Sequence, residues 1–199
     1  MNIAIDLLHS EEDFIQACIA KEGWALKKLY EFHYPVMYPV CRRYANTEED
    51  ALDILHDGFI KVFRHIDKYQ SGTSLVSWIK RVMINTAIDF YRRESRRRAV
   101  DIDDAKNLAS GEADALSNIS ADEIIDLLQH LSPAYRSVFN LYVIEGYSHK
   151  KLADILQITE STSRSNLVKA RTKLKELIAK RFQFGSFTPS SHKNDLDEA

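Results

Sequence analysis

Apolar residues recur at three- and four-residue spacings along most of the 199-residue chain, which is the periodicity of amphipathic helices. The pattern predicts helices over residues 11–22, 24–44, 47–67 and 74–97, with a break at the turn-forming stretch 70–73. Gly and Pro are scarce, at 6 and 4 residues, which also favours helix over sheet. We therefore expect an all-α protein.

The helical period lapses between residues 99 and 120, where Asp, Ala, Ser and Asn predominate, and it resumes near Ala121. We interpret this stretch as a flexible linker between two separately folded helical domains, residues 1–98 and 121–182. Residues 183–199 have the composition of a disordered tail of unknown role.

The second domain is predicted to begin with an amphipathic helix and a well-marked second helix. Ser132 supplies an N-cap and Pro133 the first helical position of a helix that runs to Ile144 and ends at Gly146. The apolar stripe that precedes it consists of Ile124, Leu127, Leu128 and Leu131.

The most specific stretch follows, in which a short helix and a long helix are separated by a tight turn. Ser148 can cap the short helix, Gln157 and Ile158 form the turn, and Thr159 can cap the long helix. Many such turns carry Gly where this chain has Gln157, so we expect a strained or locally adjusted backbone conformation there. The start of the long helix carries short polar and basic side chains: Ser161, Thr162, Arg164, Ser165, Asn166 and Lys169.

This arrangement is typical of a helix-turn-helix whose second helix enters the major groove of DNA. Polar side chains there can reach base edges, while arginine and lysine neutralise phosphates. The alternative is a helical hairpin with a solvated charged face, and we favour DNA binding because the charge density and the turn spacing agree.

The formal net charge of −2 would argue against a nucleic-acid partner, but the charge is strongly segregated. Residues 80–98 carry a balance of +5 and residues 150–181 a balance of +6, whereas residues 99–130 carry −7. Two basic modules are therefore separated by an acidic connector.

Three features limit the other classes of function. The chain has no Gly-rich phosphate loop, HExxH or GxSxG motif, and its seven histidines are scattered, so we expect neither an enzyme nor a metal or cofactor site. Cys18 and Cys41 belong to no CxxC pair and are expected to be buried and reduced. The start of the chain lacks a basic leader and an apolar signal core, and no long apolar run occurs, so we expect a cytoplasmic location without membrane insertion.

The sequence LSPAYRSVFNLYVIEGYSHKKLADILQITESTSRSNLVKARTKLKEL resembles the carboxy-terminal domain of extracytoplasmic-function sigma factors. The stretches LYEFHYPVMYPVCRRY, EEDALDILHDGFIKVF and LVSWIKRVMINTAIDFYRRESRRR are similar, in this order, to helices of the first domain of that family. The resemblance implies a subunit that directs bacterial core RNA polymerase to promoters and assists their opening. It also implies an anti-sigma factor as a partner.

The resemblance implies which residues contact promoter DNA and which contact core polymerase. The second domain would read the −35 promoter element with the polar and basic residues given above. Core polymerase would bind the acidic residues Glu49, Asp50, Asp53 and Asp57. The −10 element would contact Tyr69, Lys80, Arg81, Asn85, Arg92 and Arg93, with an extruded base held by Asn85 and the loop 69–74.

Each assignment has an alternative. The acidic residues could be a solvated helix face, and a divalent-metal site is a weaker reading because helical acids without loop ligands rarely enclose a hard cation. Asn85 could be a solvent-facing helix residue, and Trp78 is assigned to packing. Two rival functions also remain: a stand-alone transcription regulator and a nuclease built on the acidic patch. Neither the promoter sequence, the regulon nor the inducing signal can be read from the residues.

Overall fold

A computed structural model describes residues 11–98 and 121–185. The expected linker, 99–120, and the tail from residue 186 onward lie outside the described residues. The described part is helical, as predicted, and it contains no strand.

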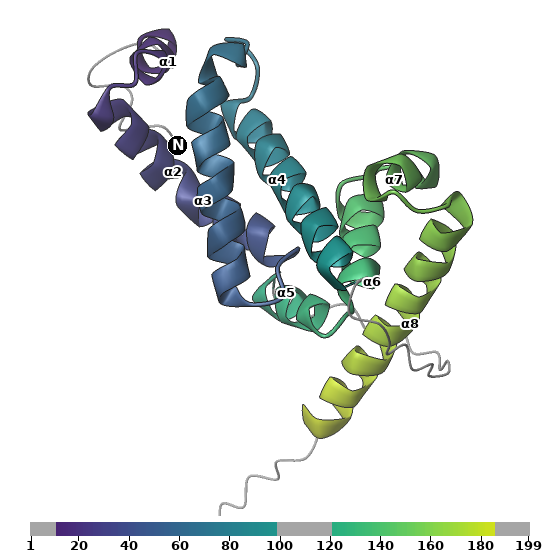
Figure 1. Ribbon diagram of the computed structural model, residues 1–199. Helices are drawn as coiled ribbons and strands as arrows, with labels where there is room; N and C mark the ends of the chain where they lie inside the picture. Colours follow the sequence, from purple (N-terminus) through teal and green to yellow (C-terminus); the bar gives the residue numbers. More distant parts are fainter. Residues whose placement is uncertain (1–10, 99–120, 186–199) are drawn as a thin grey trace, which may run out of the picture.

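The first domain consists of four α-helices and a short 3₁₀ turn. Figure 1 shows α2, α3 and α4 packed side by side, with α1 across one end. Their bounds are α1 Glu11–Ile19, α2 Gly23–Arg42, α3 Glu48–His65, η1 Ile66–Lys68 and α4 Leu75–Arg98.

The second domain contains the predicted helix-turn-helix. Its α6 continues, as expected, to Ile144, but the last turn is π-helical and Gly146 follows with a φ of +75°. The bounds are α5 Ala121–Gln129, α6 Pro133–Phe139, η2 Asn140–Ile144, α7 His149–Leu156 and α8 Glu160–Gly185.

The first-domain core forms where the apolar faces of α2, α3 and α4 meet. Leu29, Phe59 and Met83 come from these three helices and are fully buried. Gly58 lies directly against the Met83 side chain, in space that a Cβ atom would fill, so the missing side chain lets α3 and α4 approach closely. Cys18 and Cys41 are also buried, as predicted, and burial raises their thiol pKa values to about 11 and about 12.

Side-chain caps fix where several helices begin. Thr47 accepts a hydrogen bond from the Asp50 amide at 3.0 Å, and the Asp50 carboxylate accepts one from the Thr47 amide at 3.2 Å, which is a capping box for α3. Ser132 and Ser148 cap α6 and α7 as the sequence predicted.

The two domains are in direct contact. The first-domain helix α4 contacts α6 and α7 of the second domain, and Val138, Leu141, Leu152 and Leu156 join the apolar cluster of the first domain. Ile124 of the predicted stripe is 43% exposed, whereas Leu127, Leu128 and Leu131 are buried.

The turn between α7 and α8 has the strained residue that the sequence predicted. Gln157 has φ +56° and ψ +46°, the left-handed conformation, and its neighbour Ile158 donates to the Ala153 carbonyl at 3.1 Å. A side chain at Cβ makes this conformation costly, and glycine removes the cost.

We therefore predict that Gln157→Gly stabilises the protein by up to about 1 kcal/mol, because relief of the strain exceeds the added flexibility of the unfolded chain. Thermal unfolding followed by circular dichroism measures this change. Gln157→Ala is the control, since it keeps the Cβ atom and should give no gain. A lower melting temperature for Gln157→Gly than for Gln157→Ala would contradict the assignment of strain.

Candidate nucleic-acid interface

Helix α4 presents a basic and polar side to solvent. Arg81, Asn85 and Arg93 are exposed, while Lys80 and Arg92 are partly covered, with 38% and 29% of their side chains exposed. The apolar side of the same helix, with Ile79, Met83 and Ile88, is buried. Of the six residues that the resemblance assigned to the −10 element, three are thus exposed, two are partly covered, and Tyr69 is buried.

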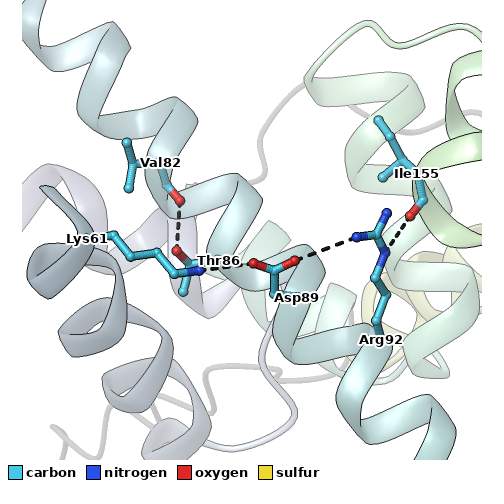
Figure 2. Close-up of polar contacts among 6 residues, drawn as sticks. All are labelled: Lys61, Val82, Thr86, Asp89, Arg92 and Ile155. Carbon is cyan, nitrogen blue, oxygen red and sulfur yellow. Dashed lines mark hydrogen bonds and ion pairs between the residues drawn. The ribbon is translucent and has the colours of Figure 1, made fainter. Parts of the chain in front are cut away.

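Arg92 is oriented by a chain of polar contacts that Figure 2 shows. Asp89 pairs with Lys61 of α3 at 3.0 Å and with Arg92 at 3.6 Å. The Arg92 Nε–H then donates to the Ile155 carbonyl, at the end of α7, at 2.8 Å. Arg92 therefore links the two domains in this structure.

Tyr69 is 7% exposed and supports the loop rather than lying on its surface. Its hydroxyl donates to the Thr73 carbonyl and to Glu11, and its ring meets Trp78 edge-on at 6.0 Å between centroids. A direct contact of Tyr69 with a base would require the loop to move. Trp78 is packed against the core, in agreement with its assignment to packing.

The acidic residues of α3 do not form one equivalent set. Glu49, Asp53 and Asp57 are exposed at helical spacing, next to His56. Asp50 is instead half-buried, and its carboxylate accepts from the Asn46 and Thr47 amides at 3.2 Å each. The capping of α3 explains Asp50 without any partner.

In the second domain, a partly buried hydrogen bond joins the two helices of the helix-turn-helix. Ser163 is fully buried, and its hydroxyl lies 2.9 Å from His149 Nδ1. The His149 ring also stacks on Tyr142, at 4.3 Å between centroids. Burial, and secondarily the charge of Arg164, lower the pKa of His149. This contact fixes how α8 projects from α7.

The exposed side of α8 carries most of the residues that the sequence singled out. Ser161, Thr162, Arg164, Ser165 and Lys169 are exposed, and Asn166 is half-buried. The opposite side, with Leu167 and Ala170, is buried. The long helix therefore projects its polar residues as a major-groove reader requires.

Two of these side chains already have partners. Thr162 lies 2.8 Å from the hydroxyl of the N-cap Thr159, and Arg164 pairs with Glu160. A DNA contact by either would compete with a contact that exists in the free chain.

Sequence reasoning missed Val168, which is 63% exposed in the middle of this polar face. Its spacing of three from Ser165 places it on the same side of the helix. An apolar side chain among groove-reading residues can contact a thymine methyl group. The signal available was an apolar residue off the buried stripe, directly beside Leu167.

A second set of missed residues lies where the two domains meet. Helix α2 ends at this seam, and three backbone carbonyls, that of its last residue and two just after it, accept hydrogen bonds from second-domain side chains. Gln129 donates to the Arg42 carbonyl at 2.6 Å, Asn140 to the Arg43 carbonyl at 2.6 Å, and Arg136 to the Ala45 carbonyl.

Arg136 is the most deeply placed of these donors, at 2% exposure. It also donates to the Leu131 carbonyl at 3.0 Å, to Gln129 at 3.0 Å and to the Asn46 side chain at 3.2 Å. Its guanidinium thus holds α5, α6 and the end of α2 together.

Glu145, just after the π-helical turn, holds two first-domain cations. It pairs with Arg43 at 3.0 Å and with Lys80 at 2.9 Å, and only 9% of its side chain is exposed. Ion pairs with this little solvent are screened far less than surface pairs. Lys80 is one of the residues assigned to the −10 element, so the second domain covers part of that surface.

The described residues contain neither a cluster of metal-ligating side chains nor a helix that could span a membrane. Nowhere in residues 11–98 and 121–185 do three His, Cys, Asp or Glu side chains gather closely enough to hold a metal ion. Nor does any helix in those ranges have the length and apolar character of a membrane span.

Comparisons with known proteins agree with the two-domain division. Residues 29–97 match the model of sigma-70 region 2, and residues 121–174 match that of sigma-70 region 4. The chain is 24% identical over 169 residues, 85% of each chain, to the ECF RNA polymerase sigma factor SigM of Mycobacterium tuberculosis. It is 29% identical over 158 residues to SigE of Mycolicibacterium smegmatis, covering 77% of this chain and 61% of SigE.

One solved structure is also similar to this chain. The sigma factor RpoE from Bartonella quintana, solved with the anti-sigma factor NepR, is 21% identical to this chain, with a TM-score of 0.46. The overlap covers 77% of this chain and 96% of that one.

The different surroundings of Asp50 and Asp53 give a testable contrast. We predict that Asp50→Ala lowers the free energy of unfolding by about 1 kcal/mol, because α3 loses its capping carboxylate. Asp53→Ala, the matched control on the exposed face, should change it by less than about 0.5 kcal/mol. Urea unfolding followed by circular dichroism makes the comparison, and equal losses would contradict the capping role.

Proposed function

The chain belongs to the extracytoplasmic-function branch of the sigma-70 family, and from this membership we propose how its surfaces direct core RNA polymerase to promoters. The observation that carries the proposal is that the region 2 and region 4 modules occur in order, each with a cationic helix side facing solvent. Residues 11–98 form the first module and residues 121–185 the second.

We assign recognition of the −35 element to the exposed side of α8. Arg164 and Lys169 would neutralise phosphates, while Ser161, Ser165 and Val168 lie where a side chain can reach base edges. The hydrogen bond between His149 and Ser163 supports this role, because it joins α7 to the start of α8.

We assign the −10 element to α4 and the loop before it. Asn85 is exposed on the same helix as Arg81 and Arg93, so its amide can offer both a donor and an acceptor to an extruded base. The cations next to it would compensate for the stacking lost when the duplex opens. Tyr69 then acts beneath the loop by shaping it.

We assign core polymerase binding to the exposed carboxylates of α3, Glu49, Asp53 and Asp57. Like charges at helical spacing are unfavourable in isolation, and a cationic partner relieves them. Asp50 contributes through the helix cap instead.

Two further parts of the proposal follow from family membership. The chain has no reaction of its own and acts in the cytoplasm, where it needs core polymerase and promoter DNA and no cofactor. An anti-sigma factor is proposed as the partner that restrains it.

The decisive experiment is transcription in vitro with purified chain and purified bacterial core polymerase. We predict initiation at promoters that core alone ignores, and mapped start sites then give the −10 and −35 sequences. Tight duplex binding by the chain without any core association would favour a stand-alone regulator. Metal-dependent DNA cleavage by the chain would favour a nuclease.

A substitution on α8 tests the division of labour. We predict that Lys169→Ala weakens −35-dependent initiation. It should also reduce the magnitude of the slope of log DNA affinity against log salt concentration by about 1, because one phosphate contact is lost. Association with core polymerase, measured by fluorescence anisotropy, should not change.

Lys175→Ala is the matched control, because Lys175 is an exposed lysine further along the same helix. It should leave both initiation and the salt slope near the wild-type values. A loss of core binding by Lys169→Ala equal to its loss of initiation would refute the assignment of α8 to DNA.

A further inference from the structure

Four uncharged side chains form a row along the centre of the exposed side of α8: Ser161, Ser165, Val168 and Thr172. They follow one another at helical spacings of four, three and four residues. Each lies two positions before a residue of the packed side, which consists of Ser163, Leu167, Ala170 and Leu174. Because two positions are about 200° around a helix, this central row lies opposite the packed side. In the proposed function it faces the floor of the major groove.

The cations of the reading helix lie at the edges of the central row and not within it. Arg164 is on one edge and Lys169 on the other, each about 70° from the centre of the row. From there they can reach phosphates on the two sides of the groove. The amide of Asn166 is half-buried and lies about 130° from the row.

The composition of the central row limits what it can recognise. Guanine and adenine are read in the major groove by bidentate contacts from a guanidinium, an ammonium or a side-chain amide. The row contains none of these groups. Its base contacts must therefore come from hydroxyl groups and from the apolar surface of Val168 and Thr172.

Val168 differs from the rest of the row because it has no polar atom in its side chain. It is 63% exposed, more than any other large apolar side chain in the part of the chain that the structure describes. Valine is also a weaker helix former than the leucine, lysine and alanine that adjoin it. Neither packing nor helix propensity accounts for a valine at this position.

The chemistry of base edges in the major groove identifies a partner for this side chain. Every base presents hydrogen-bond donors or acceptors there, and thymine alone adds a methyl group at C5. Opposite guanine, adenine or cytosine, Val168 would remove water from a polar group without pairing it, which is unfavourable. Opposite thymine, its two methyl groups can bury the methyl group of the base.

We propose that Val168 is a specificity-determining residue of this chain, which reads the methyl group of one thymine in the −35 element. The inference rests on the proposed function, because it names the base chemistry that the exposed side of α8 recognises. Thr172 presents a further methyl group one helical turn along the row. The −35 element of this chain therefore contains at least one A·T pair.

The size and the salt dependence of this contact can be stated in advance. Burial of one methyl group raises the affinity about fourfold. The contact is apolar, so the factor should be the same at low and high salt. The phosphate contacts of Arg164 and Lys169 behave differently, because their contribution falls as the salt concentration rises.

Uracil is the probe, because it differs from thymine only in lacking the methyl group. Holoenzyme, assembled from the full chain and bacterial core polymerase, is bound to synthetic duplexes of a promoter mapped in the transcription experiment above. Each thymine of the −35 element, on either strand, is replaced in turn by uracil. Affinity is measured by fluorescence anisotropy at two salt concentrations. One position should lose about fourfold in affinity, by the same factor at both salt concentrations.

Three variants assign the loss to one side chain. Val168→Ala places a good helix former at an exposed position, so it should fold, and it should bind the thymine and uracil duplexes equally. Val168→Ile keeps a branched apolar side chain and should keep the discrimination. Val143→Ala is the matched control, because it removes the same groups from another exposed valine of the second domain. It should keep the fourfold ratio.

A −35 element without an A·T pair would overturn the inference, and so would affinities that no uracil substitution changes. A loss that persists in Val168→Ala would also overturn it, because the methyl group would then act through the shape of the DNA. Initiation can be intact in all three results, so the inference can fail while the proposed function stands. Absence of initiation at every promoter would contradict the proposed function, and the reading of thymine would fail with it.

Discussion

Backbone carbonyls at the carboxy-terminal end of α2 and in the turn after it accept hydrogen bonds that join the two domains. The last carbonyls of any helix lack partners within the helix, and burying them without donors is costly. Here Gln129, Arg136 and Asn140 of the second domain donate to the carbonyls of Arg42, Ala45 and Arg43. The last residue of α2 and the turn that follows it are therefore given hydrogen-bond partners by the side chains of the other domain.

The same relation holds in the opposite direction at α7. The Ile155 carbonyl, near the carboxy terminus of α7, accepts a hydrogen bond from Arg92 of α4. Figure 2 shows this bond as the last in the series of polar contacts that begins at Lys61. A cation at a helix carboxy terminus is also favoured by the helix dipole. Arg92 can thus bind a helix end or a phosphate, and the two uses exclude each other.

The periodic and capping signals of the sequence predicted the fold closely, because both act over a few residues. Apolar spacing located the helices, and Ser132, Ser148 and Gln157 marked their ends and the strained turn, as the structure confirms. The two cationic modules were also visible, because charge segregation is a property of sequence alone.

The contacts that join distant residues could not be predicted in this way. Arg136 and Asn140 are spaced like ordinary helix residues, and nothing local shows that they reach the end of α2, some ninety positions earlier in the chain. Asp50 counted as part of an acidic face by spacing, although its carboxylate closes a helix cap. Tyr69 was assigned to the −10 element from the resemblance, and nothing local in the sequence showed that tertiary packing buries its ring.

A sigma factor must satisfy two demands that conflict at the seam. While free, its cationic helix sides and unpaired helix ends need partners, and each domain offers the other both donors and counter-charges. In the proposed function Lys80 and Arg92 contact the −10 element, and each would first give up its partner on the second domain. The seam combines two kinds of contact: apolar side chains of the second domain that are buried in the first-domain cluster, and ion pairs and carbonyl bonds that change little in free energy when water replaces them. The apolar contacts therefore hold the two domains together, while the polar contacts determine which residues face each other.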